Sequence, residues 1–422
     1  MRDRSYIFIV LLVLTITIID LYSYRGIRIL TSEMSGWLKR GIQIAYWIIP
    51  LVILALTVYM WVNMRQVFTS SMFRVWYFMI GMFMLFYVPK LVFMVFQLGN
   101  DIIRFSGWIL SKLSTPETKA SYAASTMSRT AFLTKIGIVV SIVPFLSVIH
   151  GIVRGRFNYK VKDIRLHFRT LPKAFDGFRV LQISDWHIGS FHGQPDRVGQ
   201  AVELINRQRA DIVLFTGDIV NNIAEEMKEF IPNLRKIKAR YGVYSILGNH
   251  DYGEYVRWNS EEEHADNMQK LFDFQDEVGF RLLRNDSIVL EKEKDRIGIA
   301  GVENWGLPPF PQYGDLNKAL HTIRSLPFKI LMSHDPSHWD AEVLNNSNVD
   351  LTLSGHTHGM QFGINIPGIK WSPVQWRYKR WSGLYTEKEQ FLYVNVGIGY
   401  IGFPGRVGFL PEITVFELKC KE

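Results

Sequence analysis

Five apolar runs of strand length, each followed at once by residues that bind metals in proteins, constrain the fold of this chain more than any other feature. The runs are RVLQIS, DIVLFT, VYSIL, FKILM and VDLTLS. The motifs that follow them are Asp185-Trp186-His187, Gly217-Asp218, Gly248-Asn249-His250-Asp251, Ser333-His334-Asp335 and Gly355-His356-Thr357-His358. Open α/β sheets bind their ligands outside the carboxyl ends of the strands. Five such ends predict a single metal site at one edge of an α/β domain.

The remainder of the C-terminal part supports this fold class. From Phe178 onward, short apolar runs alternate with amphipathic stretches such as Asp196–Gln208 and Ala224–Ala239. That alternation is typical of α/β rather than all-β domains. We expect the α/β domain to span residues 178–422, after a linker of residues 155–177, and we assign residues 1–154 to a transmembrane region of about four helices.

Four apolar segments fill this first third of the chain: Tyr6–Tyr22, Ile42–Val62, Val75–Phe96 and Ile136–Val153. The second has no charged residue and is long enough to cross ~30 Å of hydrocarbon. The third is interrupted by Pro89-Lys90, which can kink a helix or turn Lys90 towards a neighbouring one. The first lacks a small-residue cleavage site and precedes three further spans, so we expect a retained anchor rather than a signal peptide. These features predict an integral multi-pass protein of the cell membrane.

Charge is distributed unevenly along the chain. The net charge is +9, but residues 1–156 hold 16 Lys/Arg against 5 Asp/Glu, and the rest holds 32 against 34. The basic excess therefore flanks the apolar spans, as in membrane proteins, and a nucleic-acid partner is not expected. Lys and Arg are nearly equal in number on the two sides of the spans, so they favour neither orientation. Cys420 is the only cysteine, which excludes an intramolecular disulfide.

The motif residues suit the hydrolysis of a phosphate ester by two metal ions. Such a pair, ~3.5–4 Å apart, activates a water and neutralises charge, provided that one ligand bridges the ions. Asp185 and His187 alternate at a strand exit and can turn to one ion, whereas Asp218 follows a glycine and is the natural bridge. Further ligands are available in Asn249, His334, His356 and His358. Mixed nitrogen and oxygen ligands suit Mn, Fe or Zn rather than Ca.

Together these motifs resemble those of the calcineurin-like metallophosphoesterase superfamily, in family order, over roughly Arg179–Lys419. DWH is similar to its D-x-H motif, TGD to G-D, GNHD to G-N-H-[DE], SHD to its isolated histidine, and GHTH to G-H-x-H. The continuation GHTHGMQ and the ending PEIT are similar to a branch with GHTHGGQ, many of whose members look membrane-attached. Some members of that branch act on lipid-linked sugar nucleotides or general phosphodiesters. The resemblance implies a four-layer αββα sandwich with both ions at the edge of the central sheets.

The resemblance also implies a role for each motif residue. One ion would be held by Asp185, His187, Asp218 and His358, and the other by Asp218, Asn249, His334 and His356. His250 would be the acid that protonates the leaving oxygen, and Asp251 would set its orientation. Asn221 departs from the family, whose fuller G-D-x-x-D motif has a second Asp there; this affects the surroundings of the ligands rather than the ligands themselves.

Several other residues allow two interpretations. Arg406 could grip a phosphate or be an ordinary solvated loop residue, and His192 is near enough to the first motif to touch a substrate. Three further histidines, His264, His321 and His338, are expected at the surface. The segment Lys370–Trp381 (KWSPVQWRYKRW) combines Trp and basic side chains, which suits either a lipid headgroup region or a plain loop over the substrate.

We therefore predict a metal-dependent phosphoesterase that cleaves a phosphodiester or pyrophosphate, lipid- or envelope-related, by attack of a metal-bridging hydroxide. Its partners would be that phosphoester, in a free or lipid-linked form, and membrane lipids. One alternative is a nuclease or nucleotide phosphodiesterase of the same fold, which the slightly acidic C-terminal part disfavours. The other is a membrane sensor without catalysis, which would be expected to have lost ligands, whereas here every motif is complete.

Overall fold

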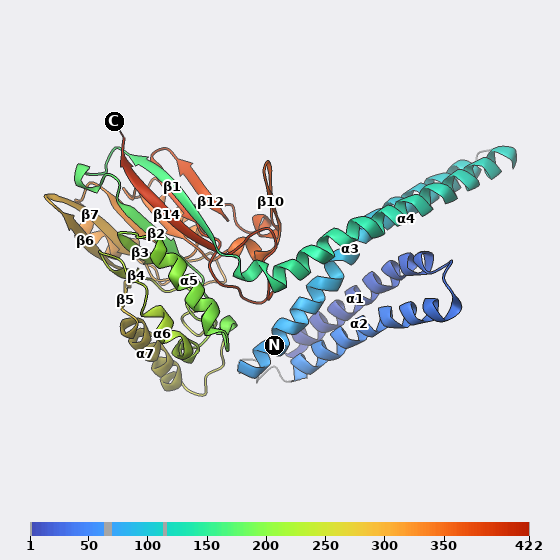
Figure 1. Ribbon diagram of the computed structural model, residues 1–422, viewed down its shortest axis with the longest axis horizontal. Helices are drawn as coiled ribbons and strands as arrows, with labels where there is room; N and C mark the ends of the chain where they lie inside the picture. Colours follow the sequence, from blue (N-terminus) through green and yellow to red (C-terminus); the bar gives the residue numbers. More distant parts are fainter. Residues whose placement is uncertain (1, 63–69, 113–115, 422) are drawn as a thin grey trace. The chain divides into compact units, whose positions relative to one another are not determined.

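The computed structural model describes residues 2–62, 70–112 and 116–421 (Figure 1). The chain divides into two compact units. Residues 1–67 and 74–150 form one, called the helical unit below; residues 68–73 and 151–422 form the other, called the sheet unit.

Four long helices make up the helical unit: α1 (Arg2–Leu30), α2 (Gly36–Val62), α3 (Ser70–Lys112) and α4 (Pro116–Val153). The first residues of α3, up to Phe73, and the last of α4, from Gly151, belong to the sheet unit. Each contains a stretch long and apolar enough to cross a membrane. Large apolar side chains such as Leu14, Val95 and Val143 are more than half exposed, as expected for side chains that face lipid. The prediction of a multi-pass membrane protein is confirmed.

A buried ion pair joins α1 to α3 within this unit. The Nζ of Lys90 lies 2.5 Å from Oδ1 of Asp20, and the Tyr87 hydroxyl donates to Oδ2 of Asp20 over 2.8 Å. Charged side chains inside a membrane region are costly unless they find such partners. Lys90 therefore turns towards a neighbouring helix, which was one of the two outcomes expected from Pro89-Lys90.

The sheet unit contains two six-stranded sheets. The first, in spatial order, consists of β1 (Lys160–Phe168), β14 (Glu412–Cys420), β2 (Arg179–Ile183), β3 (Ile212–Phe215), β4 (Val243–Ser245) and β5 (Phe280–Leu282). The second consists of β12 (Gly383–Glu387), β13 (Gln390–Val394), β9 (Leu351–Ser354), β8 (Lys329–Met332), β7 (Asp295–Gly301) and β6 (Asp286–Lys292). Four neighbouring strands in each sheet are parallel: β2 to β5 in the first, and β13, β9, β8 and β7 in the second.

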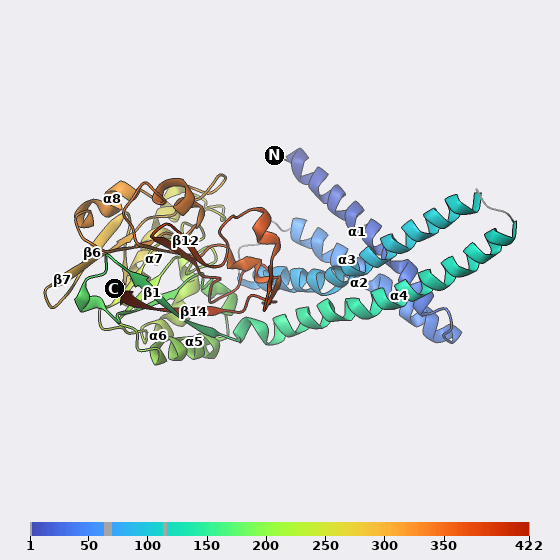
Figure 2. The ribbon, with the colours of Figure 1, turned by 90° about the horizontal axis from the view of Figure 1, so that it is seen from above.

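Helices cover the outer faces of the two sheets. The α-helices are α5 (Pro195–Arg207), α6 (Ile231–Leu234), α7 (Glu261–Glu277) and α8 (Leu316–Leu320). Short 3-10 or π-helical turns are Gly155–Phe157, Lys173–Phe175, Ile188–Phe191, Ala224–Phe230, His321–Ile323, Trp339–Val343, His358–Gln361 and Pro373–Trp376. Figure 2 shows α5 and α8 on opposite sides of the strands. The predicted amphipathic stretch Asp196–Gln208 is α5, whereas Ala224–Ala239 forms a 3-10 turn followed by the short α6.

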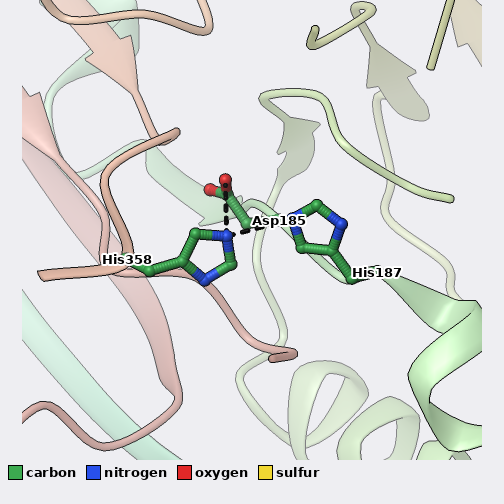
Figure 3. A group of neighbouring side chains, drawn as sticks. All are labelled: Asp185, His187 and His358. Carbon is green, nitrogen blue, oxygen red and sulfur yellow. Dashed lines mark hydrogen bonds and ion pairs between the residues drawn. The ribbon is translucent and has the colours of Figure 1, made fainter. Parts of the chain in front are cut away.

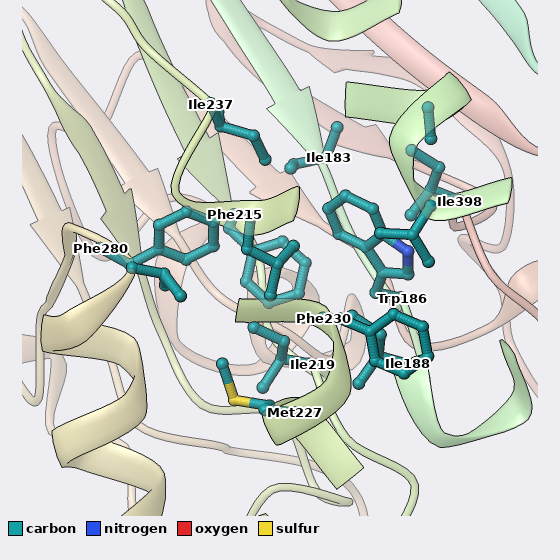
Figure 4. Packing of buried hydrophobic residues seen from close by; sticks show 14 of the residues in the cluster. Ile183, Trp186, Ile188, Phe215, Ile219, Met227, Phe230, Ile237, Phe280 and Ile398 are labelled. Carbon is teal, nitrogen blue, oxygen red and sulfur yellow. The ribbon is translucent and has the colours of Figure 1, made fainter. Parts of the chain in front are cut away.

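Three buried apolar clusters hold the layers together. One contains residues of both sheets, such as Val180, Leu214, Ile299 and Leu353, and fills the space between them. Another joins the first sheet to its helices, with Phe215 among its members (Figure 4). The third joins the second sheet to α8 and to the turn Trp339–Val343. The predicted four-layer αββα arrangement is confirmed.

The segment expected to be a linker differs from the prediction. Within residues 155–177, Lys160–Phe168 forms β1, which pairs in parallel with β14 at the edge of the first sheet. Most side chains of β1 are exposed or half-buried, and only Leu166 and Phe168 are buried. An edge strand with charged side chains is a common way to protect a sheet edge. Its polar composition is what made it resemble a linker.

The topology brings the five motifs to one edge of the sandwich. They follow β2, β3 and β4 of one sheet and β8 and β9 of the other, all at carboxyl ends. Gly217 has a φ of +94°, and a Cβ there would lie 2.5 Å from the backbone nitrogen of Gly248. The loops after β3 and β4 therefore approach each other backbone to backbone, which the glycine before Asp218 permits.

Candidate metal centre

The first group of ligand-type side chains comprises Asp185, His187 and His358 (Figure 3). The Nε2 atoms of His187 and His358 are 3.0 Å apart, and Nε2 of His358 lies 3.3 Å from Oδ1 of Asp185. All three side chains are buried. One potential ligand atom from each lies within 4.8 Å of the others, close enough to share one metal ion.

The second group comprises Asp218, His334 and His356, again within 4.8 Å of one another. Asn249 adjoins it, because its Oδ1 lies 2.8 Å from Nδ1 of His356. The structure thus brings together all seven residues that the sequence suggested as ligands, in two sets of the expected membership.

Asp218 lies between the two groups. Its Oδ2 is 3.2 Å from Nε2 of His334 and 3.5 Å from Nε2 of His187. One carboxylate oxygen can therefore approach an ion in either group, which is the position that a bridging ligand requires.

The surroundings of these side chains fit metal ions. Nε2 of His334 is buried and has no hydrogen-bond partner, while Nδ1 of the same ring donates to the carbonyl of Thr216 over 2.8 Å. Nδ1 of His187 similarly faces the carbonyl of Val220 at 3.2 Å. In the neutral form of each ring this hydrogen bond places the proton on Nδ1, so the Nε2 lone pair is available to a metal ion. A donor set of imidazoles, carboxylates and one amide suits Mn, Fe or Zn.

Electrostatics at the site also favour cations. Burial lowers the pKa of the His334 imidazole, but the Asp218 carboxylate beside it outweighs burial and raises that pKa to about 10. Burial alone would raise the pKa of Asp185, yet His358 brings it down to about 2. Burial would likewise raise the pKa of Asp218, but His334 holds it well below its usual range. The two buried carboxylates therefore hold their negative charge and need positive charge beside them.

The backbone at the ligands is unusual. Five of the seven have a positive φ: Asp185 (50°), His187 (47°), Asp218 (59°), His356 (69°) and His358 (52°). Residues other than glycine seldom adopt this left-handed conformation, although Asp and His tolerate it better than most. Such strain persists only where the surrounding structure enforces it, and it is concentrated at functional sites.

Two tyrosines that were not identified from the sequence support the second group. The Tyr378 hydroxyl lies 2.6 Å from Nε2 of His356, and the Tyr255 hydroxyl accepts a hydrogen bond from Nδ2 of Asn249 over 2.8 Å. Asp335 also approaches His356, with 3.5 Å between its Oδ2 and Nε2. These contacts hold Nδ1 of His356 and Oδ1 of Asn249 towards the centre. The only signal in the sequence was the position of Asp335 in the SHD motif and of Tyr378 in the segment Lys370–Trp381.

The surroundings of His250 differ from the expectation. Nδ1 of His250 donates to the backbone carbonyl of Asn221 over 2.7 Å, so this carbonyl sets the orientation of the ring. Asp251 instead accepts backbone N–H groups of Gly248 (2.8 Å), Asp218 (2.8 Å) and Ile219 (2.9 Å). Its short side chain turns back into the loops and fastens the one after β3 to the one after β4. The prediction that Asp251 orients His250 directly is not what the structure shows.

The other residues singled out in the sequence lie away from the ligand groups or serve the framework. Arg406 is fully buried and donates to backbone carbonyls, including that of Val396 at 2.6 Å, so it is neither solvated nor open to a phosphate. His192 is exposed and lies 3.0 Å from Glu229. His338 was expected at the surface but is buried, where Nδ1 contacts the Ser333 hydroxyl at 2.8 Å.

Two family models match the chain. Residues 2–156 match the family described as "Probable Calcineurin-like phosphoesterase, transmembrane domain", and residues 178–360 match "Calcineurin-like phosphoesterase". The chain is 32% identical over 253 residues to the Bacillus subtilis "Uncharacterized metallophosphoesterase YkuE", covering 59% of this chain and 82% of that one. It is 27% identical to a Danio rerio "Transmembrane protein with metallophosphoesterase domain", covering 67% of this chain but only 62% of the relative. A solved dimetal phosphatase from Danio rerio shares 14% identity over 53% of this chain and 88% of that chain, with a TM-score of 0.30.

Proposed function

Because the chain belongs to the calcineurin-like phosphoesterases, we propose that it is a dinuclear phosphoesterase that hydrolyses a phosphodiester or pyrophosphate of a lipid- or envelope-related substrate. The observation that carries the proposal is the position of Asp218 between two groups of buried ligand-type side chains. A single structural metal would need only one such group. Two groups that share a carboxylate are the arrangement of a two-metal hydrolytic site.

The two ions would be Mn, Fe or Zn. Asp185, His187, Asp218 and His358 would hold one, and Asp218, Asn249, His334 and His356 the other. When bound, such ions neutralise phosphate charge and make a water nucleophilic near neutral pH. The protein supplies the rigid ligand loops, fastened to one another by Asp251.

His250 would donate the proton that the leaving oxygen requires. Since Nδ1 already donates to the Asn221 carbonyl, the ring can deliver a proton only through Nε2. Its ring centroid lies 4.9 Å from that of His187, beside the first ligand group. Asn221 and Asp251 would act as positioning residues, the first through its carbonyl and the second through the loops that it joins.

The substrate class rests on two features of the chain. It is a multi-pass membrane protein, which favours a substrate found at a membrane. Residues 157–422 hold 32 Lys/Arg against 34 Asp/Glu, a balance that does not favour a polyanionic nucleic acid. We also propose that residues 1–154 form the membrane region and residues 178–422 the catalytic domain. Strand β1, from the segment 155–177, then extends the first sheet of that domain.

The test is a substrate and metal screen on the full-length protein in lipid nanodiscs. Chelator-treated protein would be reloaded with Mn, Fe or Zn and offered a nitrophenyl diester, a lipid-linked pyrophosphate, a nucleotide diester and single-stranded DNA. We expect metal-dependent turnover with preference for the lipid-linked compound, and none above background in Asp218→Asn. Preference for DNA or the nucleotide diester would favour a nuclease or nucleotide phosphodiesterase, and a metal-loaded protein inactive on all of them would favour a sensor.

A further inference from the structure

A small amphipathic hairpin follows the GHTH ligands directly. Strands β10 (Ile364–Ile366) and β11 (Ile369–Trp371) pair antiparallel, and they form a two-stranded sheet of their own. Figure 1 shows the hairpin extending away from the strands of the two large sheets. A two-stranded hairpin is marginally stable in water on its own, so one with an apolar surface is expected to have a partner.

Side chains of the hairpin separate by face. Because alternate residues share a face and cross-strand partners lie opposite one another, the register places Ile364, Ile366, Ile369 and Trp371 together on one face. The three isoleucines are 47%, 56% and 53% exposed. Four neighbouring apolar side chains on a soluble surface are unusual and mark a contact site.

A fifth apolar side chain lies next to this face. Trp376 is 77% exposed, and its ring packs against that of Trp371 with 6.1 Å between centroids. Exposed tryptophan beside aliphatic residues is typical of protein that enters the interfacial zone of a membrane.

The opposite face of the hairpin is polar, and its two side chains are exposed. It carries Asn365 and Lys370, and the Lys370 ammonium donates to the carbonyl of Ser382 over 2.6 Å and lies above the ring of Trp381. The hairpin therefore has one side bonded to the sheet unit and one side that is apolar and exposed.

The base of the hairpin is joined to the end of the fourth membrane span. The backbone nitrogen of Gly363 donates to the carbonyl of Val407 over 3.0 Å, and that of Arg406 donates to the carbonyl of Gly151 over 3.1 Å. Gly151 lies in the last turns of the candidate span Arg129–Phe157 and belongs to the same compact unit as the hairpin. Two backbone hydrogen bonds thus connect the base of the hairpin to the C-terminal part of this candidate span.

The hairpin is long enough to reach a headgroup layer that lies beside the end of the span. The hairpin turn lies four or five residues beyond Gly363, about 13–17 Å at about 3.3 Å per residue. The headgroup layer on each side of the hydrocarbon is roughly 5–7 Å thick. A hairpin that starts beside the end of a span can therefore reach the interface with its apolar face.

We propose that the apolar face of the β10–β11 hairpin, with Trp376, inserts into the headgroup region of the membrane that the chain spans. The interaction is apolar rather than electrostatic. The basic residues of Lys370–Trp381 have partners within the protein, since Lys379 and Arg380 both pair with Asp340 and Arg377 donates to the carbonyl of Pro308. Contact with lipid headgroups was one of two interpretations of that segment. In this proposal the apolar face of the hairpin makes the contact, and the basic side chains do not. It does not depend on the proposed substrate.

The experiment uses the full-length protein with Cys420→Ser, which leaves no other cysteine. Single cysteines at Ile366 and Ile369 would carry an environment-sensitive fluorophore in nanodiscs of neutral phosphatidylcholine. The matched controls are Asn365→Cys on the opposite face and Lys388→Cys, which is exposed in the turn between β12 and β13. Lipids with a spin label near the headgroup quench only fluorophores in the interface, and iodide quenches those in water. Metal content equal to that of the unlabelled protein would show that each variant is folded.

We expect spin-labelled lipid to quench labels at positions 366 and 369 several-fold more strongly than the label at 388, with 365 close to 388. The quenching should persist in high salt and should not need anionic lipid. Iodide quenching at 366 and 369 equal to that at 388 overturns the proposal in favour of a hairpin in water. Labels shielded from both quenchers, together with disulfide cross-linking of Ile366→Cys between two copies, overturn it in favour of self-association.

Discussion

The two ligand groups of the metal centre are supported in different ways. Around Asp185, His187 and His358 the support comes from the framework: the His187 ring is fixed by the carbonyl of Val220, and His358 lies against the buried Arg406, 3.1 Å from its Nη2. All of these side chains are buried.

In the second group, two ligands are held by tyrosine side chains that are partly exposed. His356 is fixed by Tyr378 and Asn249 by Tyr255, which is 40% exposed. Only His334 is fixed by a backbone carbonyl, that of Thr216. A hydrogen bond to a partly exposed side chain is easier to alter than one to a buried backbone carbonyl, so the second ion should be the weaker and the more adjustable of the two. Asp218 is the exception, since it serves both groups.

The largest effect is expected at this shared residue. Asp218→Asn should deplete both ions and reduce activity by more than the ~10–100-fold typical of contacts behind the ligands. Asp185→Asn, a matched carboxylate change in the first group alone, should leave the second ion in place. Metal content by mass spectrometry and turnover would be measured on both variants. Two ions retained in Asp218→Asn would show that the groups do not share it.

A smaller effect, separate from the metals, is expected at His250. His250→Ala should lower the rate by ~10²–10⁴-fold, the usual contribution of general acid catalysis, and keep both ions. The loss should be smaller for a nitrophenolate leaving group, which scarcely needs a proton. Rates would be compared for good and poor leaving groups. Equal losses for the two would contradict the role of an acid.

The substitution Tyr378→Phe tests whether the two groups bind their ions independently. Removing the hydroxyl beside His356 should weaken the second ion by about 10–100-fold and leave the first unchanged. Tyr159→Phe is the control, because that hydroxyl donates to the backbone carbonyl of Arg197 rather than to a ligand candidate. Stepwise metal titration would separate the two affinities, and an equal weakening of both ions would remove the distinction drawn here.

The smallest effect concerns pH. In metal-free protein the raised pKa of His334, about 10, keeps its ring protonated at neutral pH. That proton must leave before the ring can bind an ion, so affinity for the second ion should rise with pH, by about tenfold per unit for one released proton. Titration with Mn in weak buffer would record both affinity and released protons. An affinity that does not change between about pH 6 and 8 would contradict the linkage.

The sequence predicted the fold well where pattern and chemistry act locally. Apolar runs before Asp185, Asp218 and His334 identified strands, and since carboxyl ends of parallel strands share an edge, the meeting of the ligand candidates followed. The uncharged run Ile42–Val62 identified a membrane helix by length alone. β1 was missed because an edge strand with charged side chains has the composition of a linker.

What could not be predicted depends on contacts between distant segments. Tyr378 meets His356 across 22 positions, and the carbonyl that orients His250 belongs to Asn221, whose side chain carries no hint of that role. The resemblance implied that Asp251 orients His250, but its carboxylate accepts hydrogen bonds from backbone N–H groups 32 and 33 positions away. Backbone partners of this kind leave no residue-type signal.

The central claim is that one carboxylate joins two ions at the edge of the sandwich. Anomalous diffraction from crystals of the full-length protein loaded with manganese tests it directly. The account predicts two peaks ~3.5–4 Å apart, one on each side of the Asp218 carboxylate, with Asp185, His187 and His358 around one and Asn249, His334 and His356 around the other. A single peak in fully loaded protein, or two peaks without Asp218 between them, would contradict it.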